Sequence, residues 1–179
     1  MITRFTLFCL IICMVFLNPI LSQTKEDTKV ELKFSIDTRF GLGKGSFKKT
    51  SIMVKDRKAG LGIIEIDTSS IDTGNSMRDT HLRDPDFFDV QKFPKAEFEI
   101  LGLEESGTDS VKGKGKLTLK GITKEYSFVA SIIRTTDSEK FSGSIKINRK
   151  DYGMVYQSMM NPIEDIANLE FTVILPLKK

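Results

Sequence analysis

The sequence predicts an all-β protein, an eight-stranded antiparallel barrel with short helices in one long connection. Two observations support this prediction. Apolar and polar residues alternate with the strand period of two in segment after segment, and short turns separate most of these segments. An antiparallel sheet with one apolar face can bury that face by closing on itself. A sandwich of two sheets fits the same pattern and stays open as an alternative.

The predicted strands follow one another along most of the chain. In the first, over residues 30–40, the apolar residues share one parity and the polar residues take the other. Glycines such as Gly113 and Gly143 are expected at the bends and bulges that closure requires. Eight strands leave an interior that either fills with side chains or holds one small ligand. The other seven strands are expected at about residues 45–55, 61–67, 95–100, 116–120, 126–132, 141–148 and 169–175.

One long connection, between the third and fourth predicted strands, breaks this rhythm. Ser76 with an acid three residues later resembles a capping box and predicts a helical turn over 76–82. The pair Asp84-Pro85 predicts a second turn over 85–90. The apolar members of this connection are expected to cover one barrel opening as a plug or a lid. They are Met77, Leu82, Phe87, Phe88 and Phe93.

The beginning of the chain reads as an export signal over residues 1–22. Arg4 supplies a positive start, and an apolar run too short to span a bilayer follows it. Cleavage after Ser22 would leave residues 23–179 as one barrel domain that is periplasmic or secreted, and a retained anchor is the alternative. Both cysteines lie in the apolar run, so the mature chain would have no disulfide and no thiolate ligand.

Charge and composition exclude several other classes. The chain has 27 Lys and Arg against 24 Asp and Glu, with both signs mixed, which argues against a nucleic-acid surface. His81 is the single histidine, and scattered aspartates around it make a weak zinc site. The glycines form neither a P-loop nor a dinucleotide fingerprint. Without a second histidine or a free thiol the common nucleophile and base pairs lack parts, so we predict no enzyme, no catalytic residue, no metal and no cofactor.

Three segments resemble motifs of the YceI family. They read SIDTGNSMRDTHLRDPDFFD with FPKAEF (70–89 and 93–98), VKGKGKLTLKGITK (111–124) and INRKDYG (147–153). The resemblance implies a secreted bacterial protein with a lipocalin-like β-barrel that holds a long isoprenoid or similar amphiphile. Many members carry histidines in the first strands, and this chain has none there, so no contact of that kind is carried over.

The alternation and the resemblance together predict the ligand-binding residues. The parity of the strands that is nearly free of charge is expected to line an apolar tunnel, with Phe34, Ile36, Phe98, Ile100, Leu117, Leu119, Phe128, Ile145, Ile147 and Phe171. The connection is expected to supply a lid or a head-group contact, with Met77, Arg78, His81, Phe87 and Phe88. A structural role is the alternative for two of these: His81 would bond to backbone, and Arg78 would pair with Asp79, Asp84 or Asp86. Arg149 and Asp151 are expected to fix the turn before Gly153.

The leading functional hypothesis is a carrier of a long-chain isoprenoid or acyl lipid. We expect no nucleic-acid partner and no stable membrane span after signal removal, and a homodimer is possible. A second hypothesis is a barrel with a filled interior that serves as a scaffold for protein interactions. A third, an enzyme acting on lipid precursors, would need a reactive polar cluster inside the tunnel.

Overall fold

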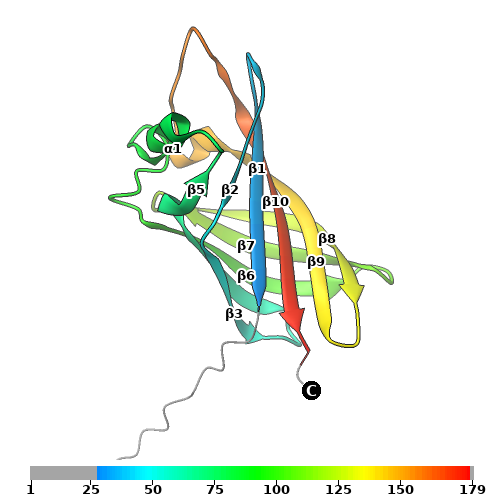
Figure 1. Ribbon diagram of the computed structural model, residues 1–179. Coiled ribbons are helices and arrows are strands. Elements are labelled where there is room, and N and C mark those ends of the chain that lie inside the picture. The colour runs from blue at the N-terminus through cyan, green and yellow to red at the C-terminus, as the bar shows by residue number, and fades with distance from the viewer. Residues whose placement is uncertain (1–27, 178–179) are drawn as a thin grey trace, which may run out of the picture.

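The computed structural model describes residues 28–177 and shows one antiparallel sheet that curls into an incomplete barrel (Figure 1). The strands lie in the order β3-β4-β6-β7-β8-β9-β10-β1-β2-β5. Their bounds are β1 (Lys29–Thr38), β2 (Gly41–Phe47), β3 (Thr50–Asp56), β4 (Leu61–Asp67), β5 (Ile71–Asp72), β6 (Lys95–Glu105), β7 (Ser110–Leu119), β8 (Ile122–Arg134), β9 (Ser138–Asn148) and β10 (Ile163–Pro176). The helices are η1 (Thr68–Ser70), α1 (Ser76–Arg83) and η2 (Arg149–Tyr152). The all-β antiparallel prediction is confirmed.

The strand count differs from the predicted eight, because the segment expected as one strand over 45–55 divides in two. β2 pairs with β1, whereas β3 pairs with β4, and only Lys48 and Lys49 separate them in the chain. The amide of Lys48 donates to the carbonyl of Ser70 at 3.1 Å, outside both ladders. Two consecutive strands thus lie near opposite ends of the strand order, which requires the sheet to curl. The two-residue β5 accounts for the remaining difference.

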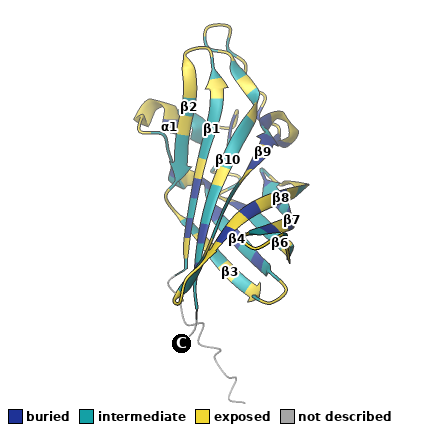
Figure 2. Ribbon diagram, turned by 90° about the vertical axis from the view of Figure 1, so that its right-hand side faces the viewer, coloured by how far each residue is buried: buried dark blue, intermediate teal, exposed yellow. Residues whose placement is uncertain are grey.

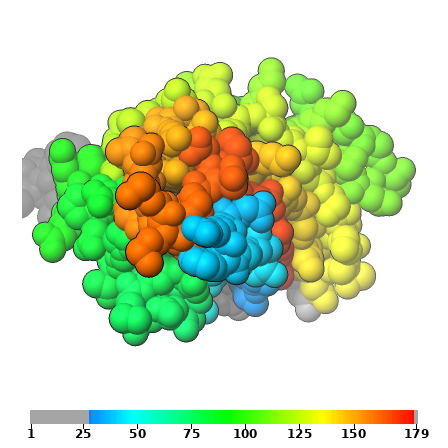
Figure 3. Space-filling view, turned by 90° about the horizontal axis from the view of Figure 1, so that it is seen from above, coloured from blue at the N-terminus to red at the C-terminus, as the bar shows by residue number. Residues whose placement is uncertain are grey.

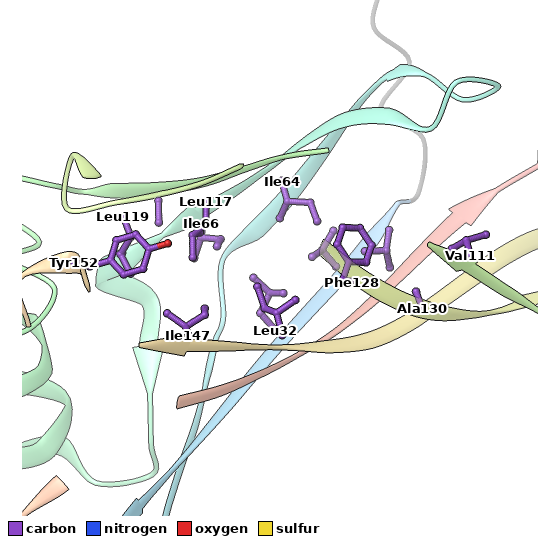
Figure 4. Close-up of a cluster of buried hydrophobic side chains, with 14 of the residues drawn as sticks. Leu32, Ile64, Ile66, Val111, Leu117, Leu119, Phe128, Ala130, Ile147 and Tyr152 are labelled. Carbon is purple, nitrogen blue, oxygen red and sulfur yellow. The ribbon is translucent and has the colours of Figure 1, made fainter. Parts of the chain in front are cut away.

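Burial follows the predicted alternation closely. Along β7, Val111, Leu117 and Leu119 are buried, whereas Lys112 and Lys114 between them are exposed (Figure 2). The buried side chains from the inner faces form one apolar cluster that runs through the curled sheet (Figure 4). A period of two therefore placed each face of these strands correctly.

β6 changes its parity part-way along. Its register with β7 shifts between Ile100 and Gly102, so the inward positions before the shift are even-numbered and Leu103 points inward after it. A bulge inserts one extra residue and moves every later side chain to the other face. Because the prediction ended this strand at residue 100, it missed the inward Leu103.

Inward glycines serve a different purpose from the predicted bends. Gly143 lies opposite Phe171 in the β9–β10 ladder, and a Cβ added to Gly143 would come within 2.7 Å of Cζ of that ring. Gly113 stands in the same relation to Phe128 across β7 and β8. The missing side chains give the rings room beside the sheet.

The connection after β4 holds one α-helix. Asn75, and not Ser76, caps α1, because its side chain accepts from the amide of Arg78 at 3.1 Å. The second predicted helical turn, over 85–90, is formed by hydrogen-bonded turns and not by a regular helix: the carbonyl of Asp84 accepts from the amides of Phe87 and Asp89. Asp89 has φ of 49°, in the left-handed region, which prevents a continuing right-handed helix there.

Two predictions about the membrane concern the beginning of the chain. The proposed signal over residues 1–22 lies outside the described residues. Within residues 28–177, no helix is both long enough and apolar enough to cross a membrane.

Candidate functional site

The inside of the curled sheet contains a cavity whose lining is entirely apolar. Its volume is about 80 Å³. A cavity with this lining cannot hydrogen-bond a polar molecule and favours hydrocarbon. The lining residues are Leu32, Ile52, Ile64, Ile66, Phe98, Ile100, Leu103, Val111, Leu117, Phe128, Ala130, Phe141, Ile145, Leu169, Phe171, Val173 and Leu175.

The cavity is long and narrow. On β7 the lining runs from Val111 to Leu117, and on β10 it runs from Leu169 to Leu175. At about 3.3 Å per residue, either stretch spans roughly 20 Å. A volume of about 80 Å³ spread over that length makes the cavity narrow.

One end of the cavity is closed by buried side chains. Tyr152 and Leu119 lie at one end of the apolar cluster, and Val111 and Ala130 lie at the other (Figure 4). Tyr152 is fully buried, and its hydroxyl donates to the hydroxyl of Tyr126 at 3.0 Å. Burial, reinforced by this hydrogen bond, raises the pKa of Tyr152 far above its ordinary value. The neutral phenol thus belongs to the buried cluster beyond the end of the cavity.

A group of three rings lies in the loops above this closed end. His81 packs edge-on against Phe87 at 5.0 Å between ring centroids and against Tyr156 at 4.8 Å. Phe87 is buried and lies 5.0 Å from the ring of Tyr156. We call His81, Phe87 and Tyr156 the plug cluster. The segments that carry it, coloured green and orange, lie side by side in the view from above (Figure 3).

Hydrogen bonds within the chain occupy the polar groups around the plug cluster. The buried carboxylate of Asp79 accepts from the amide and the hydroxyl of Thr73 at 2.8 and 2.6 Å. Arg78 donates to the hydroxyl and carbonyl oxygens of the same Thr73. Lys120 donates to the carbonyl of Pro85 at 2.7 Å, and burial lowers the pKa of its ammonium. These bonds give the connection a structural role, in which Arg78 bonds Thr73 and not the expected aspartates.

Arg149 anchors the second loop at the closed end. Its guanidinium is buried and bonds to the 154–165 segment at several points. Arg149 was predicted to fix a turn, and it holds a whole loop. Asp151, which was predicted to share this role, is exposed. The acceptors are the carbonyl oxygens of Met154, Tyr156, Ile163 and Glu164 and the carboxylate of Asp165.

The opposite end of the cavity continues into a polar opening, which we call the mouth. A second hollow of about 350 Å³ shares the lining residues Leu103, Val111 and Phe141 with the apolar cavity. Around it stand charged residues from the β3–β4 turn, β6, β8 and β9. They are Asp56, Arg57, Lys58, Glu105, Arg134 and Glu139.

The structure brings most of the predicted tunnel residues to the cavity. Phe98, Ile100, Leu117, Phe128, Ile145 and Phe171 line it. Leu119 and Ile147 are buried beyond its closed end, and Phe34 and Ile36 lie on the part of β1 that extends past it. Phe141 was not predicted as a tunnel residue, although it continues the alternation assigned to its strand. In all, the prediction left out eleven lining residues: Leu32, Ile52, Ile64, Ile66, Leu103, Val111, Ala130, Phe141, Leu169, Val173 and Leu175.

None of the five predicted lid residues lines the cavity or the mouth. Met77 is 80% exposed, Arg78 is bonded to Thr73, and His81 and Phe87 belong to the plug cluster. Phe88 packs against Phe47 at 5.6 Å between centroids. The connection therefore covers the closed end, and any contact of these residues with a ligand stays a prediction.

The described residues contain no group of three or more His, Cys, Asp or Glu side chains arranged to hold a metal ion. The glutamates at the mouth form ion pairs with arginines. Arg134 contacts Glu105 at 2.5 Å and Glu139 at 3.4 Å, and Arg57 lies 3.6 Å from Glu139.

The antiparallel curled sheet with its plugged end and apolar interior defines a lipocalin-like β-barrel protein. The family model of the YceI-like domain matches residues 24–175, and the chain belongs to the YceI family. This membership confirms the resemblance that the three sequence motifs indicate.

Known relatives support the same assignment. The chain is 38% identical over 97 residues to a UPF0312 protein of Pseudomonas aeruginosa, and the match covers 51% of this chain and 50% of the relative. A UPF0312 protein of Azotobacter vinelandii is 31% identical over 116 residues, which cover 62% of this chain and 59% of that protein. The chain thus matches about half of the length of such relatives.

Solved structures share the fold. BcnA of Burkholderia cenocepacia superposes with a TM-score of 0.73 at 23% identity, over 81% of this chain and 95% of that one. A polyisoprenoid-binding domain from Saccharophagus degradans gives a TM-score of 0.71 at 18% identity, over 83% and 94%. The YceI protein of Campylobacter jejuni gives 0.66 at 27% identity, over 76% and 86%.

Proposed function

We propose that this protein is an exported carrier that binds a long-chain isoprenoid or acyl amphiphile with its chain in the apolar cavity. The observation that supports this function most is the shape and lining of the cavity, which is roughly 20 Å long by strand length, narrow and free of polar groups. A single hydrocarbon chain fits these properties, whereas a sugar, nucleotide or peptide would lose its hydrogen bonds there.

The expected affinity is adequate for a carrier. Each buried methylene group contributes about 0.8 kcal/mol, so about ten of them contribute about 8 kcal/mol before the cost of immobilising the chain. The cavity wall is already formed by paired strands, which limits further ordering costs. A branched isoprenoid and a straight acyl chain both satisfy this estimate.

Family membership adds support from another direction. The polyisoprenoid-binding domain of Saccharophagus degradans has the same fold, although its low identity extends the likeness to the fold alone. The apolar run near Arg4 supports export to the periplasm or beyond. Within the cavity lining no side chain carries a nucleophile or a base, which favours binding over catalysis.

Native mass spectrometry of the mature protein, purified from its own export compartment and followed by solvent extraction, tests the proposal. We expect a bound isoprenoid or acyl lipid. The variant Ala130→Leu should lose it, because Ala130 is buried and lines the cavity. Ala96→Leu is a matched control, since Ala96 is equally a buried inward alanine but does not line the cavity. A protein that is empty and also refuses added long-chain lipids would contradict the carrier.

One observation favours a scaffold as the second candidate. Phe40, Met159 and Met160 are 77%, 97% and 81% exposed, and they lie on two loops joined by the bond from the amide of Arg39 to the carbonyl of Pro162. Exposed apolar residues at neighbouring loop tips are typical of interaction surfaces. A pull-down tests this candidate. It would be favoured if the wild type captures one specific protein, if the double variant Met159→Ser, Met160→Ser does not, and if neither of the two proteins takes up lipid.

A further inference from the structure

We infer that the charged mouth is the head-group site, and that it selects amphiphiles with a neutral, oxygen-bearing head over amphiphiles with a phosphate head. This inference rests on the proposed function, because it assumes that the hydrocarbon chain occupies the cavity. The sequence predicted the head-group contact near the plug cluster. The inference places the head group at the opposite end of the cavity.

Continuity between the two hollows gives the position. Leu103, Val111 and Phe141 line both the apolar cavity and the mouth, so a chain that fills the first emerges in the second. Tyr152 lies at the other end of the apolar cluster and is fully buried, so the packed side chains there offer no polar opening for a head group. An amphiphile inserted chain-first therefore leaves its polar end among the charged residues.

The charges at the mouth decide the class of head. Three cationic residues, Arg57, Lys58 and Arg134, stand beside three anionic ones, Asp56, Glu105 and Glu139, so the formal sum is zero. Arg134 is already shared between Glu105 and Glu139 at 2.5 and 3.4 Å. A diphosphate would bring several negative charges next to three carboxylates with no excess of positive charge to compensate them.

Arg57 supplies hydrogen-bond donors for a neutral head. A guanidinium has five N–H donors. Among the described residues, Arg57 makes one recorded hydrogen bond, from Nη2 to the carbonyl of Pro176 at 2.8 Å, and its Nε lies 3.6 Å from Glu139. Its side chain is 33% exposed and lines the mouth. A hydroxyl or carbonyl oxygen placed there can accept from Arg57, and a hydroxyl can also donate to Glu139.

The test compares three ligands that share one tail: a long-chain prenyl alcohol, its diphosphate and the corresponding hydrocarbon. Each is titrated into delipidated mature protein by native mass spectrometry. The wild type should bind the alcohol more tightly than the diphosphate. Arg57→Leu should weaken alcohol binding about tenfold and leave hydrocarbon binding unchanged.

A second substitution tests the charge argument through an expected gain in affinity, where Arg57→Leu is expected to cause a loss. Glu139→Gln removes a carboxylate from the mouth and should strengthen binding of the diphosphate. Glu125→Gln is the matched control, because Glu125 is also ion-paired, with Lys116 at 3.6 Å, but lies outside the mouth. This control should change no affinity.

The outcomes separate the two proposals. Hydrocarbon binding together with tighter binding of the diphosphate, or with no effect of Arg57→Leu on the alcohol, would overturn the head-group site and leave the carrier intact. Failure of all three ligands to bind would overturn the carrier and the head-group site with it.

Discussion

Gly113 lies opposite Phe128 in the β7–β8 ladder, and the aromatic ring occupies the space that a Cβ on Gly113 would need. Phe171 uses Gly143 in the same way across β9 and β10. Both rings also line the cavity. A large ring can therefore stay close to the sheet, so these pairs keep the interior open where a filled barrel would close it.

Gly113→Ala should reduce lipid binding. The three atoms nearest to the added methyl group belong to the side chains of Phe128 and Leu103, so we expect the ring of Phe128 to move toward the cavity. Such overpacking costs about 1 to 3 kcal/mol, and if this cost falls on the bound state the affinity should drop about fivefold to a hundredfold. Titration with a long-chain alcohol measures the change. Gly102→Ala, which meets nothing closer than 3.9 Å, should bind as the wild type does, and equal affinities in both variants would contradict the account.

Tyr152→Phe should change the pH dependence of stability. At neutral pH the variant loses the hydrogen bond to Tyr126 and about 1 kcal/mol of unfolding free energy. In the unfolded chain the Tyr152 phenol ionises near pH 10, whereas its folded pKa is raised by burial. The stability due to the neutral phenol is thus complete below about pH 10 and falls above it, by up to about 1.4 kcal/mol per pH unit.

Urea unfolding at several pH values between neutral and strongly alkaline checks this prediction. The difference between wild type and Tyr152→Phe should shrink above about pH 10, because only the wild type gains an ionised tyrosine at this position on unfolding. A difference that stays constant over the alkaline range would show that Tyr152 ionises equally in both states.

Arg149→Ala should destabilise the fold by about 3 kcal/mol, because it removes a buried cation that bonds four carbonyl groups of the 154–165 segment. Arg149→Lys should restore little, since an ammonium cannot reproduce the planar fork of donors. Chemical denaturation measures both. Wild-type stability in the lysine variant would mean that charge alone matters at this site.

His81→Ala should affect stability and not lipid affinity. The imidazole packs edge-on against Phe87 and Tyr156 and lies outside the cavity lining. Losing these contacts should cost about 1 to 2 kcal/mol of unfolding free energy. Thr80→Ala, an exposed position on the same helix, is the control. A large fall in lipid affinity at unchanged stability would instead support the predicted head-group contact by His81.

The sequence predicted the faces of the strands well, because burial in a sheet imposes a period of two that each segment records locally. It could not predict that residues 41–56 switch partners at Lys48 and Lys49, since pairing depends on distant strands. For the same reason the sequence could not predict the register shift after Ile100, which turns Leu103 inward. Glycine composition also misled, because a glycine under a ring and a glycine in a bend look alike in a sequence.

The position of the mouth was the largest gap between sequence and structure. The motif-rich connection from Ser70 to Phe93 suggested a lid, yet its polar groups satisfy one another at the closed end. Arg57 and Glu139, which lie 3.6 Å apart at the mouth, belong to segments that are 82 residues apart in the chain. No local pattern marks two such residues as neighbours.

Photo-cross-linking tests the central claim most directly. A long-chain alcohol with a diazirine at the far end of its chain is bound, irradiated and mapped by mass spectrometry of peptides. The account predicts labelling deep in the cavity, on Ile66, Leu117 or Ile145. Labelling confined to the exposed loop tips at Phe40 and Met159, or to the plug cluster, would contradict it.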